Sequence, residues 1–153
     1  MAIHEPVTYL WFDDHALDAA TFYVSLFPNS SIGAVSYYRE GAQKPAGSVL
    51  VAEFSLMGRP WAALNGGPQF RHSEAVGFQV QVDTQHEIDR LWDALVADGG
   101  EELMCGWCKD RFGVSWQIIP RTLGERLGSS DLEVSGRAWQ AMMGMRRIVI
   151  ADL

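Results

Sequence analysis

The sequence predicts an α+β fold built from two copies of one small unit, because the chain repeats itself. Val7-Thr8-Tyr9-Leu10-Trp11-Phe12-Asp13 precedes a helix-like run, and the pattern recurs as Gly77-Phe78-Gln79-Val80-Gln81-Val82-Asp83 before a second such run. Each copy closes with Gly-x-x-Trp, at residues 58–61 and 113–116. Such duplication determines the architecture. We expect two βαβββ modules with a cleft where they meet.

The first module is expected to span residues 7–66. Its first strand, 7–12, alternates between two faces, with Tyr9 and Trp11 on one of them. Asp13-Asp14 is expected to cap a helix over 16–27, which Pro28 would end. The remaining elements are expected to be strands at 32–39, 48–56 and 60–65, with a loop at 41–47 and a hairpin turn at 57–59.

The second module, 76–120, repeats this order after a short linker over 66–75. Its helix, 85–97, carries apolar residues at helical spacing and is followed by Gly99-Gly100. Strands are expected at 76–82, 101–108 and 114–119. An extension over 121–153 would then contain a helical turn at 123–127, a helix at 135–145 and a strand-like segment at 147–150. The whole chain, 1–153, is expected to form a single domain.

Composition argues against several classes of function. The formal net charge is −7, and an acidic surface repels phosphate backbones, so we expect no nucleic-acid partner. No apolar stretch approaches the roughly 20 residues that a membrane helix needs. The N-terminal residues 1–6 show no basic region followed by an apolar one, so a cytoplasmic location is expected.

Four segments carry a family resemblance. They are residues 9–13, 22–30, 63–68 and 105–117, which read YLWFD, FYVSLFPNS, ALNGGP and CGWCKDRFGVSWQ. Together they resemble the vicinal oxygen chelate superfamily, which includes glyoxalase I, bleomycin-resistance proteins and extradiol dioxygenases. The match is to its PhnB-like branch, often labelled 3-demethylubiquinone-9 3-methyltransferase. The resemblance implies that the two modules pair into an eight-stranded mixed sheet around a cleft, and that the protein is a homodimer.

The resemblance also indicates where metal-using relatives hold their ligands. Carried onto this chain, those positions are Val7, Ala62, Gly77 and Gln117. Three of them have no donor atom, and a neutral amide replaces a carboxylate poorly, whereas a divalent cation needs several His, Asp or Glu donors. We therefore expect no metal and no cofactor.

Because side chains alternate along a strand, most of the candidate ligand-binding residues share a sheet face with the four positions that hold metal ligands in relatives. Aromatic walls with a few amides are typical of a pocket for a neutral or flat organic molecule, although such a surface can equally be a packing face. Asn65, at a strand end, is expected to reach the same opening. The candidate ligand-binding residues are Tyr9, Trp11, Asn65, Gln79, Gln81, Ser115 and Gln117.

Other motifs favour structural roles. Cys105-Gly106-Trp107-Cys108 is formally CxxC, but it lies between a strand and a turn, so an ordinary reduced pair is favoured over a redox or metal site. Asp13 and Asp83 each stand between a strand and a helix, where capping is favoured over acid–base chemistry. No glycine-rich turn follows Phe12, as a methyltransferase of the doubly wound fold would require.

These observations favour a small-molecule-binding PhnB-like protein whose metal ligands are lost and in which any catalysis is metal-independent. The alternative is an enzyme of the glyoxalase or dioxygenase kind, or the methyltransferase of the family label. The apolar tail, 132–153, and the sheet edges need covering, which agrees with a homodimer.

Overall fold

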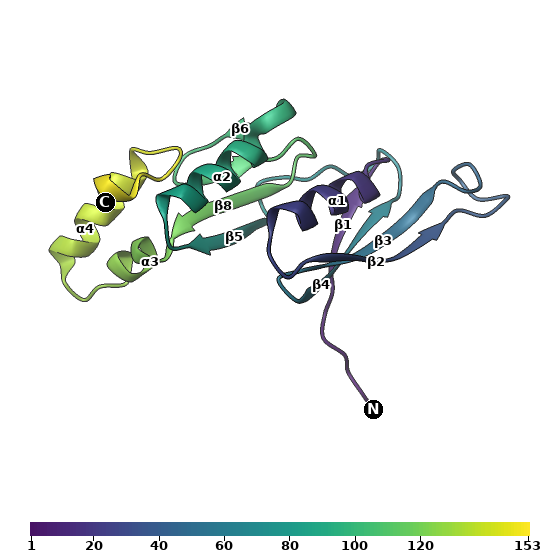
Figure 1. Cartoon of the computed structure of the whole chain (residues 1–153), viewed down its shortest axis with the longest axis horizontal. Coiled ribbons are helices and arrows are strands. Elements are labelled where there is room, and N and C mark those ends of the chain that lie inside the picture. The colour runs from purple at the N-terminus through teal and green to yellow at the C-terminus, as the bar shows by residue number, and fades with distance from the viewer. The chain divides into compact units, whose positions relative to one another are not determined.

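A computed structural model describes all 153 residues of the chain (Figure 1). The chain divides into two compact units, residues 1–71 and 72–153, and the division falls within the predicted linker. Each unit holds a four-stranded mixed sheet, with strand orders β1-β4-β3-β2 and β5-β8-β7-β6. Because the two orders are equivalent, the predicted α+β fold of two βαβββ units is confirmed.

Unit 1 packs one helix against one face of its sheet (Figure 1). β1 runs parallel to β4, and the other neighbours are antiparallel. The buried side chains of α1 recur at helical spacing, from Ala16 to Leu26, and form the stripe that faces the sheet. No helix of unit 1 covers the opposite face, which we call the open face of unit 1. The elements are β1 (Thr8–Phe12), α1 (Ala16–Leu26), β2 (Ser31–Tyr37), β3 (Val49–Leu56) and β4 (Arg59–Asn65).

Unit 2 repeats the arrangement and adds helices after its last strand. The helix α2 begins with a capping box, in which Thr84 and Glu87 satisfy each other's backbone N–H groups. Its buried residues, Ile88, Leu91, Trp92 and Leu95, are those predicted from the spacing. The elements are β5 (Gly77–Val82), α2 (Gln85–Val96), η1 (Ala97–Gly99), β6 (Glu101–Glu102), β7 (Trp107–Lys109), β8 (Ser115–Pro120), α3 (Arg121–Leu127), α4 (Leu132–Met143) and η2 (Ile150–Asp152).

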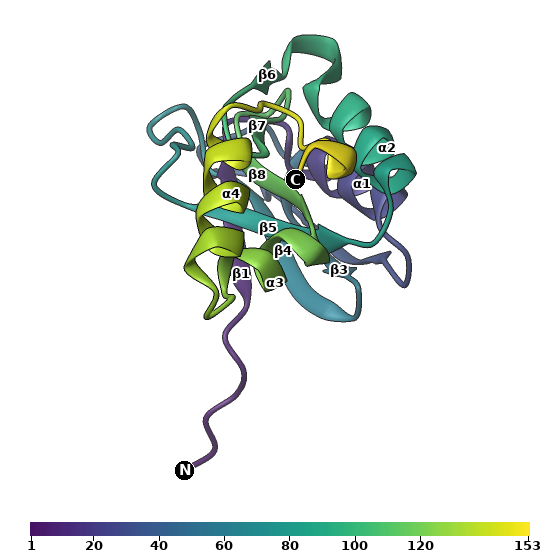
Figure 2. The same ribbon diagram turned by 90° about the vertical axis from the view of Figure 1, so that its left-hand side faces the viewer.

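The C-terminal extension packs onto unit 2 itself. The helices α3 and α4 lie beside each other (Figure 2) and enclose a small apolar cluster with the end of β8. The backbone N–H groups of Cys105 and Gly106 donate to the carbonyls of Met145 and Arg146, which ties the tail to the sheet. The buried members of the cluster are Ile119, Leu123, Ala138, Met142 and Ile148.

Three local predictions are corrected. The segment 101–108 is two short strands, not one, because Cys105 and Gly106 both take positive φ angles and turn the chain. Residues 147–150 do not form a strand, because the Gln85 side chain bonds the backbone of Ile148 and Ile150 in place of a strand partner. The last helix begins at Leu132, capped by Asp131, rather than at residue 135.

The predicted aspartate caps are also wrong. The N-cap position of α1 is His15, whose own side chain makes no capping hydrogen bond, and Asp13 instead forms an ion pair with Lys44. The cap of α2 is Thr84, and Asp83 forms an ion pair with Arg121 at 2.9 Å. Both aspartates stand near the helix starts, but the capping hydrogen bonds come from other residues. In α2 the adjacent Thr84 supplies them, and in α1 a residue distant in the sequence does.

Candidate functional site

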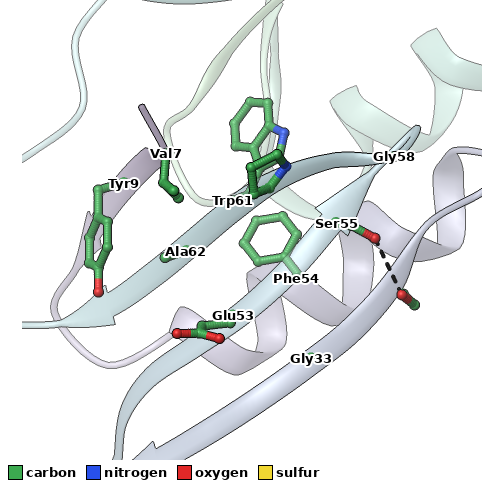
Figure 3. Close-up of a pocket in the computed structure, with 11 residues that line it drawn as sticks. Val7, Tyr9, Gly33, Glu53, Phe54, Ser55, Gly58, Trp61 and Ala62 are labelled. Carbon is green, nitrogen blue, oxygen red and sulfur yellow. Dashed lines mark hydrogen bonds between the residues drawn. The ribbon is translucent and has the colours of Figure 1, made fainter. Parts of the chain in front are cut away.

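A hollow of about 440 Å³ lies on the open face of unit 1 (Figure 3). Strand pairing places Tyr9 of β1, Ala62 of β4 and Glu53 of β3 in one row across the sheet. The volume falls within the range of small-molecule sites. The lining residues are Val7, Tyr9, Ser31, Gly33, Glu53, Phe54, Ser55, Gly58, Pro60, Trp61 and Ala62.

Small residues create the hollow and aromatic residues flank it. Ala62 forms part of the base, and Gly33 on the edge strand has no side chain to fill the space beyond Glu53. Tyr9 stands beside Ala62 with 58% of its surface exposed. Phe54 and Trp61, whose ring centroids lie 6.0 Å apart, are also among the lining residues, but they alternate with Glu53 and Ala62 along their strands, and the Phe54 ring packs against Tyr23 of α1. An exposed aromatic ring beside a small-residue floor offers a stacking surface to a flat ligand.

Glu53 is the one acidic residue in the lining, and sequence reasoning did not select it. Its side chain is exposed and forms no hydrogen bond or ion pair within the chain. The signal was present in the alternation of strand 48–56, where Val49, Val51, Glu53 and Ser55 share a face. The pairing of β3 with β4 was needed to bring that face beside Tyr9.

Trp11 lies on the same face of β1 as Tyr9 but is occupied by contacts within unit 1. Its indole N–H donates to the carbonyl of Gly67 at 2.8 Å, and Phe70 packs edge-on at 5.0 Å between ring centroids. A Cβ atom at Gly66 would lie 2.2 Å from the Trp11 ring, so the indole covers that glycine. Trp11 therefore holds the start of the linker in place and is not part of the hollow's lining.

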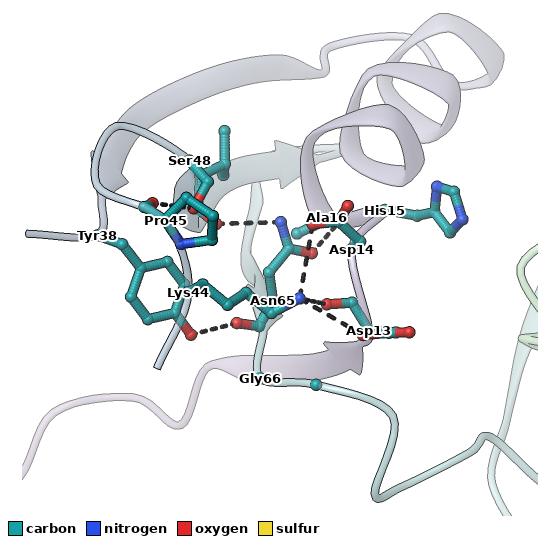
Figure 4. Close-up of polar contacts among 12 residues, drawn as sticks. Asp13, Asp14, His15, Ala16, Tyr38, Lys44, Pro45, Ser48, Asn65 and Gly66 are labelled. Atoms are coloured by element: carbon teal, nitrogen blue, oxygen red, sulfur yellow. Dashed lines mark hydrogen bonds and ion pairs between the residues drawn. The ribbon is translucent and has the colours of Figure 1, made fainter. Parts of the chain in front are cut away.

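Asn65 lies on the helix-facing side of its strand, where both ends of its amide are engaged (Figure 4). Its Oδ1 accepts from the backbone N–H of Ala16 at 2.8 Å, which is the cap that the aspartates do not supply. Its Nδ2 donates to the carbonyl of Val49 at 3.1 Å, and the Tyr38 hydroxyl donates to its backbone carbonyl. The side chain is 3% exposed, so Asn65 belongs to the framework of unit 1 rather than to the hollow.

In unit 2, three predicted glutamines form a hydrogen-bonded row on the sheet face opposite Trp116. Gln81 donates to Gln79 at 3.2 Å, and Gln79 donates to Gln117 at 2.8 Å. Gln117 donates in turn to the backbone carbonyl of Cys105 at 3.1 Å. The bond from Gln117 to the backbone therefore fixes one end of the row, while Gln79 and Gln81 remain exposed. It offers amide groups of defined orientation to a molecule lying on this face.

Ser115 lies on the same face but is covered. Its side chain is 1% exposed, and its Oγ is buried without a hydrogen-bond partner. The neighbouring strand residue is Gly77, where an added Cβ would lie 2.2 Å from a ring carbon of Trp107. The Trp107 ring thus occupies the space that a side chain at residue 77 would need.

The four positions that carry ligands in metal-using relatives do not fit a metal ion here. In unit 1, Val7 and Ala62 line the hollow but offer no donor atom. In unit 2, the place of a side chain at Gly77 is filled by Trp107, and the Gln117 amide is engaged with Gln79 and Cys105. No group of three or more His, Cys, Asp and Glu side chains is arranged to hold a metal.

The two cysteines occupy different environments. Cys108 is buried on β7, and burial, with Asp110 and Glu102 nearby, raises the pKa of its thiol to about 12. Cys105 is partly exposed in the turn before β7, with its Sγ 3.6 Å from the Met143 sulfur. Neither thiol lies at a helix N-terminus, where a redox-active thiolate would be stabilised.

The profile of the 3-demethylubiquinone-9 3-methyltransferase family matches residues 4–119, most of both units. The chain belongs to this family. Among solved structures, it is 32% identical to a Bacillus cereus protein named PhnB and titled as a candidate 3-demethylubiquinone-9 3-methyltransferase. That match has a TM-score of 0.70 and covers 76% of this chain and 99% of the other. No curated protein matches the sequence.

Two more distant structures share the fold of this PhnB-like chain. One is the protein PA1353 of Pseudomonas aeruginosa, at 22% identity and TM-score 0.62, covering 77% of this chain and 98% of the other. The second is the fosfomycin resistance protein FosX of Listeria monocytogenes, at 18% identity and TM-score 0.57, covering 84% and 100%. The fold is that of the vicinal oxygen chelate superfamily, as the resemblance implied. The structure contains no helix long and apolar enough to cross a membrane.

Proposed function

We propose that this PhnB-like protein binds a small, flat organic molecule in the hollow of unit 1. The single observation that carries the proposal is the hollow itself, in which the exposed Tyr9 ring stands beside Ala62, and Gly33 leaves space beyond Glu53 at the other end of the row. Stacking on an exposed ring and burial of apolar area supply the affinity. The missing donors at Val7 and Ala62 support a site that acts without a metal, so any catalysis is proposed to be metal-independent.

We further propose that the glutamine row of unit 2 is a polar contact surface for a small molecule. Gln79 and Gln81 present amide groups whose orientation the row itself restricts, through bonds of 2.8 and 3.2 Å. Restricted amides lose less conformational entropy on binding than free ones. Of the residues predicted from sequence, Tyr9, Gln79, Gln81 and Gln117 remain in the proposal, while Trp11 and Asn65 are engaged within unit 1 and Ser115 is buried in unit 2.

A thermal-shift screen of metabolites and aromatic antibiotics tests the binding proposal. A ligand raises the melting temperature through mass action, by an amount set by its concentration relative to Kd. Tyr9→Ala should abolish the shift of a ligand bound in the hollow, and Gln117→Ala that of a ligand bound on the glutamine row. Tyr37→Ala is the matched control, because Tyr37 is an exposed aromatic on β2 outside the lining. Hits whose shifts survive Tyr9→Ala and Gln117→Ala would refute both surfaces.

The rival function is methyl transfer, which the description of the family favours. The residues after β1 are Asp13-Asp14-His15 rather than a glycine-rich turn, and neither sheet is a doubly wound parallel one. Addition of S-adenosylmethionine to the same thermal-shift assay separates the two functions. A strong stabilisation by this compound would favour the methyltransferase over a binding protein.

We also propose that the protein is a homodimer. Large apolar side chains on α4 remain exposed after the extension has packed, including Leu132 at 84% and Trp139 at 56%. Exposed apolar surface of this kind favours association. Light scattering should give twice the mass of the chain at micromolar concentration, and a monomer would contradict the proposal. The cytoplasmic location stays a prediction, which cell fractionation tests.

A further inference from the structure

Glu53 distinguishes the hollow from an ordinary apolar pocket, because it adds a carboxylate to the lining. Its carboxylate stands in the row formed by Tyr9, Ala62 and Glu53, and Figure 3 shows Tyr9 and Glu53 on either side of Ala62. No basic side chain is among the lining residues. The negative charge of Glu53 is therefore not neutralised by the lining and is available to a bound molecule.

The surroundings of Glu53 keep its carboxylate accessible. Its neighbour on β4 is Ala62, and the irregular pairing of β2 with β3 places Gly33 on its other side. Neither neighbour has a side chain that can donate a hydrogen bond. Other acidic residues of unit 1 do find cations, as Asp13 and Asp14 do with Lys44 at 3.4 and 3.6 Å. Glu53 has no such partner.

We propose that the molecule bound in this hollow is an organic cation, an aromatic or heteroaromatic ring bearing a protonated amine or quaternary nitrogen. Its ring lies over Ala62 against Tyr9, and its positive group meets the Glu53 carboxylate. An aromatic face also attracts a cation directly, so Tyr9 and Glu53 favour the same charge. This inference rests on the proposed function and names the class of ligand for that site.

Three probes that share one ring system test the proposal. They are 2-naphthylmethylammonium, a cation; 2-naphthalenemethanol, a neutral molecule; and 2-naphthoate, an anion. Isothermal titration of each into the wild-type protein should rank the cation tightest and the anion weakest. Raising the salt concentration should weaken the cation and leave the neutral probe unchanged, because ions screen only the charged interaction.

The variants then assign the preference to one residue. Glu53→Gln should weaken the cation about tenfold, as expected when a charged hydrogen-bond partner becomes neutral, and leave the neutral probe unchanged. Glu40→Gln is the matched control: it removes one negative charge from an exposed residue of unit 1 outside the hollow, and it should change neither affinity. Tyr9→Ala should weaken both the cation and the neutral probe.

The possible contrary results are distinct. If the neutral probe binds as tightly as the cation and Tyr9→Ala weakens both, the proposed function stands and the cation inference is overturned. If Glu40→Gln weakens the cation as much as Glu53→Gln does, the preference reflects overall charge, and the inference is again overturned. If none of the three probes binds, both the inference and the binding function in this hollow fail.

Discussion

Replacing Asn65 with alanine should lower the free energy of unfolding of unit 1 by about 2–3 kcal/mol. The change removes the only side-chain cap of α1, a 2.8 Å bond from the Ala16 N–H, and caps of this kind contribute about 1 kcal/mol. It also removes the 3.1 Å bond to the Val49 carbonyl, which contributes about 1 kcal/mol. Because the side chain is 3% exposed, water does not readily replace either partner, and a small cavity adds to the cost.

The assay is a urea titration followed by circular dichroism, with hydrogen exchange of the Ala16 amide as the local readout. Asn65→Asp should lose less stability than Asn65→Ala, since it keeps an acceptor for α1 and adds a charge that the helix N-terminus favours. Its second oxygen would face the Val49 carbonyl, so a net loss should remain.

Gln43→Ala is the matched control for this network. Gln43 is an exposed amide that donates to the Tyr38 hydroxyl at 3.2 Å and to the Gly66 carbonyl at 3.3 Å (Figure 4 shows the inner part of the network). Its loss should cost less than about 1 kcal/mol, because water can replace an exposed partner. A loss below about 1 kcal/mol in Asn65→Ala, or equal losses in the two variants, would refute the reasoning. The naphthyl probes should bind folded Asn65→Ala with unchanged affinity; a loss there would instead restore Asn65 to the ligand site.

Three further outcomes are expected. Gly77→Ala should destabilise unit 2 by about 1–3 kcal/mol in urea, because its methyl group meets the Trp107 ring, and an unchanged midpoint would contradict that packing. Glu87→Gln should reduce the fall in the free energy of unfolding on acidification. A hydrogen bond from the N-cap threonine lowers the pKa of Glu87 from 4.5. The stabilisation by its carboxylate is therefore present above that pH and is lost as the pH falls through the lowered pKa. Mass spectrometry after iodoacetamide should find Cys105 alkylated well before Cys108, whose raised pKa and burial suppress the thiolate, and equal rates would show that β7 opens readily.

Local pattern determined the elements and their order. The repeat around Tyr9 and Gln79 identified two equivalent units, and helical spacing alone selected the face of α2 that is buried. These features depend on residues within one or two turns of each other, so a sequence carries them directly. The alternation of β1 likewise placed Tyr9 on the face that proved to be open.

The tertiary structure decided what each polar residue does. Asn65 stands 49 positions from the helix start that it caps, so no local motif marked it as a cap. Trp107 fills the space above Gly77 only because β7 and β5 flank β8. Glu53 became the charge of a hollow through the pairing of β3 with β4 and the irregular pairing with β2. A sequence shows which side chains share a strand face; the register between strands, set by packing across the whole sheet, determines which of them meet.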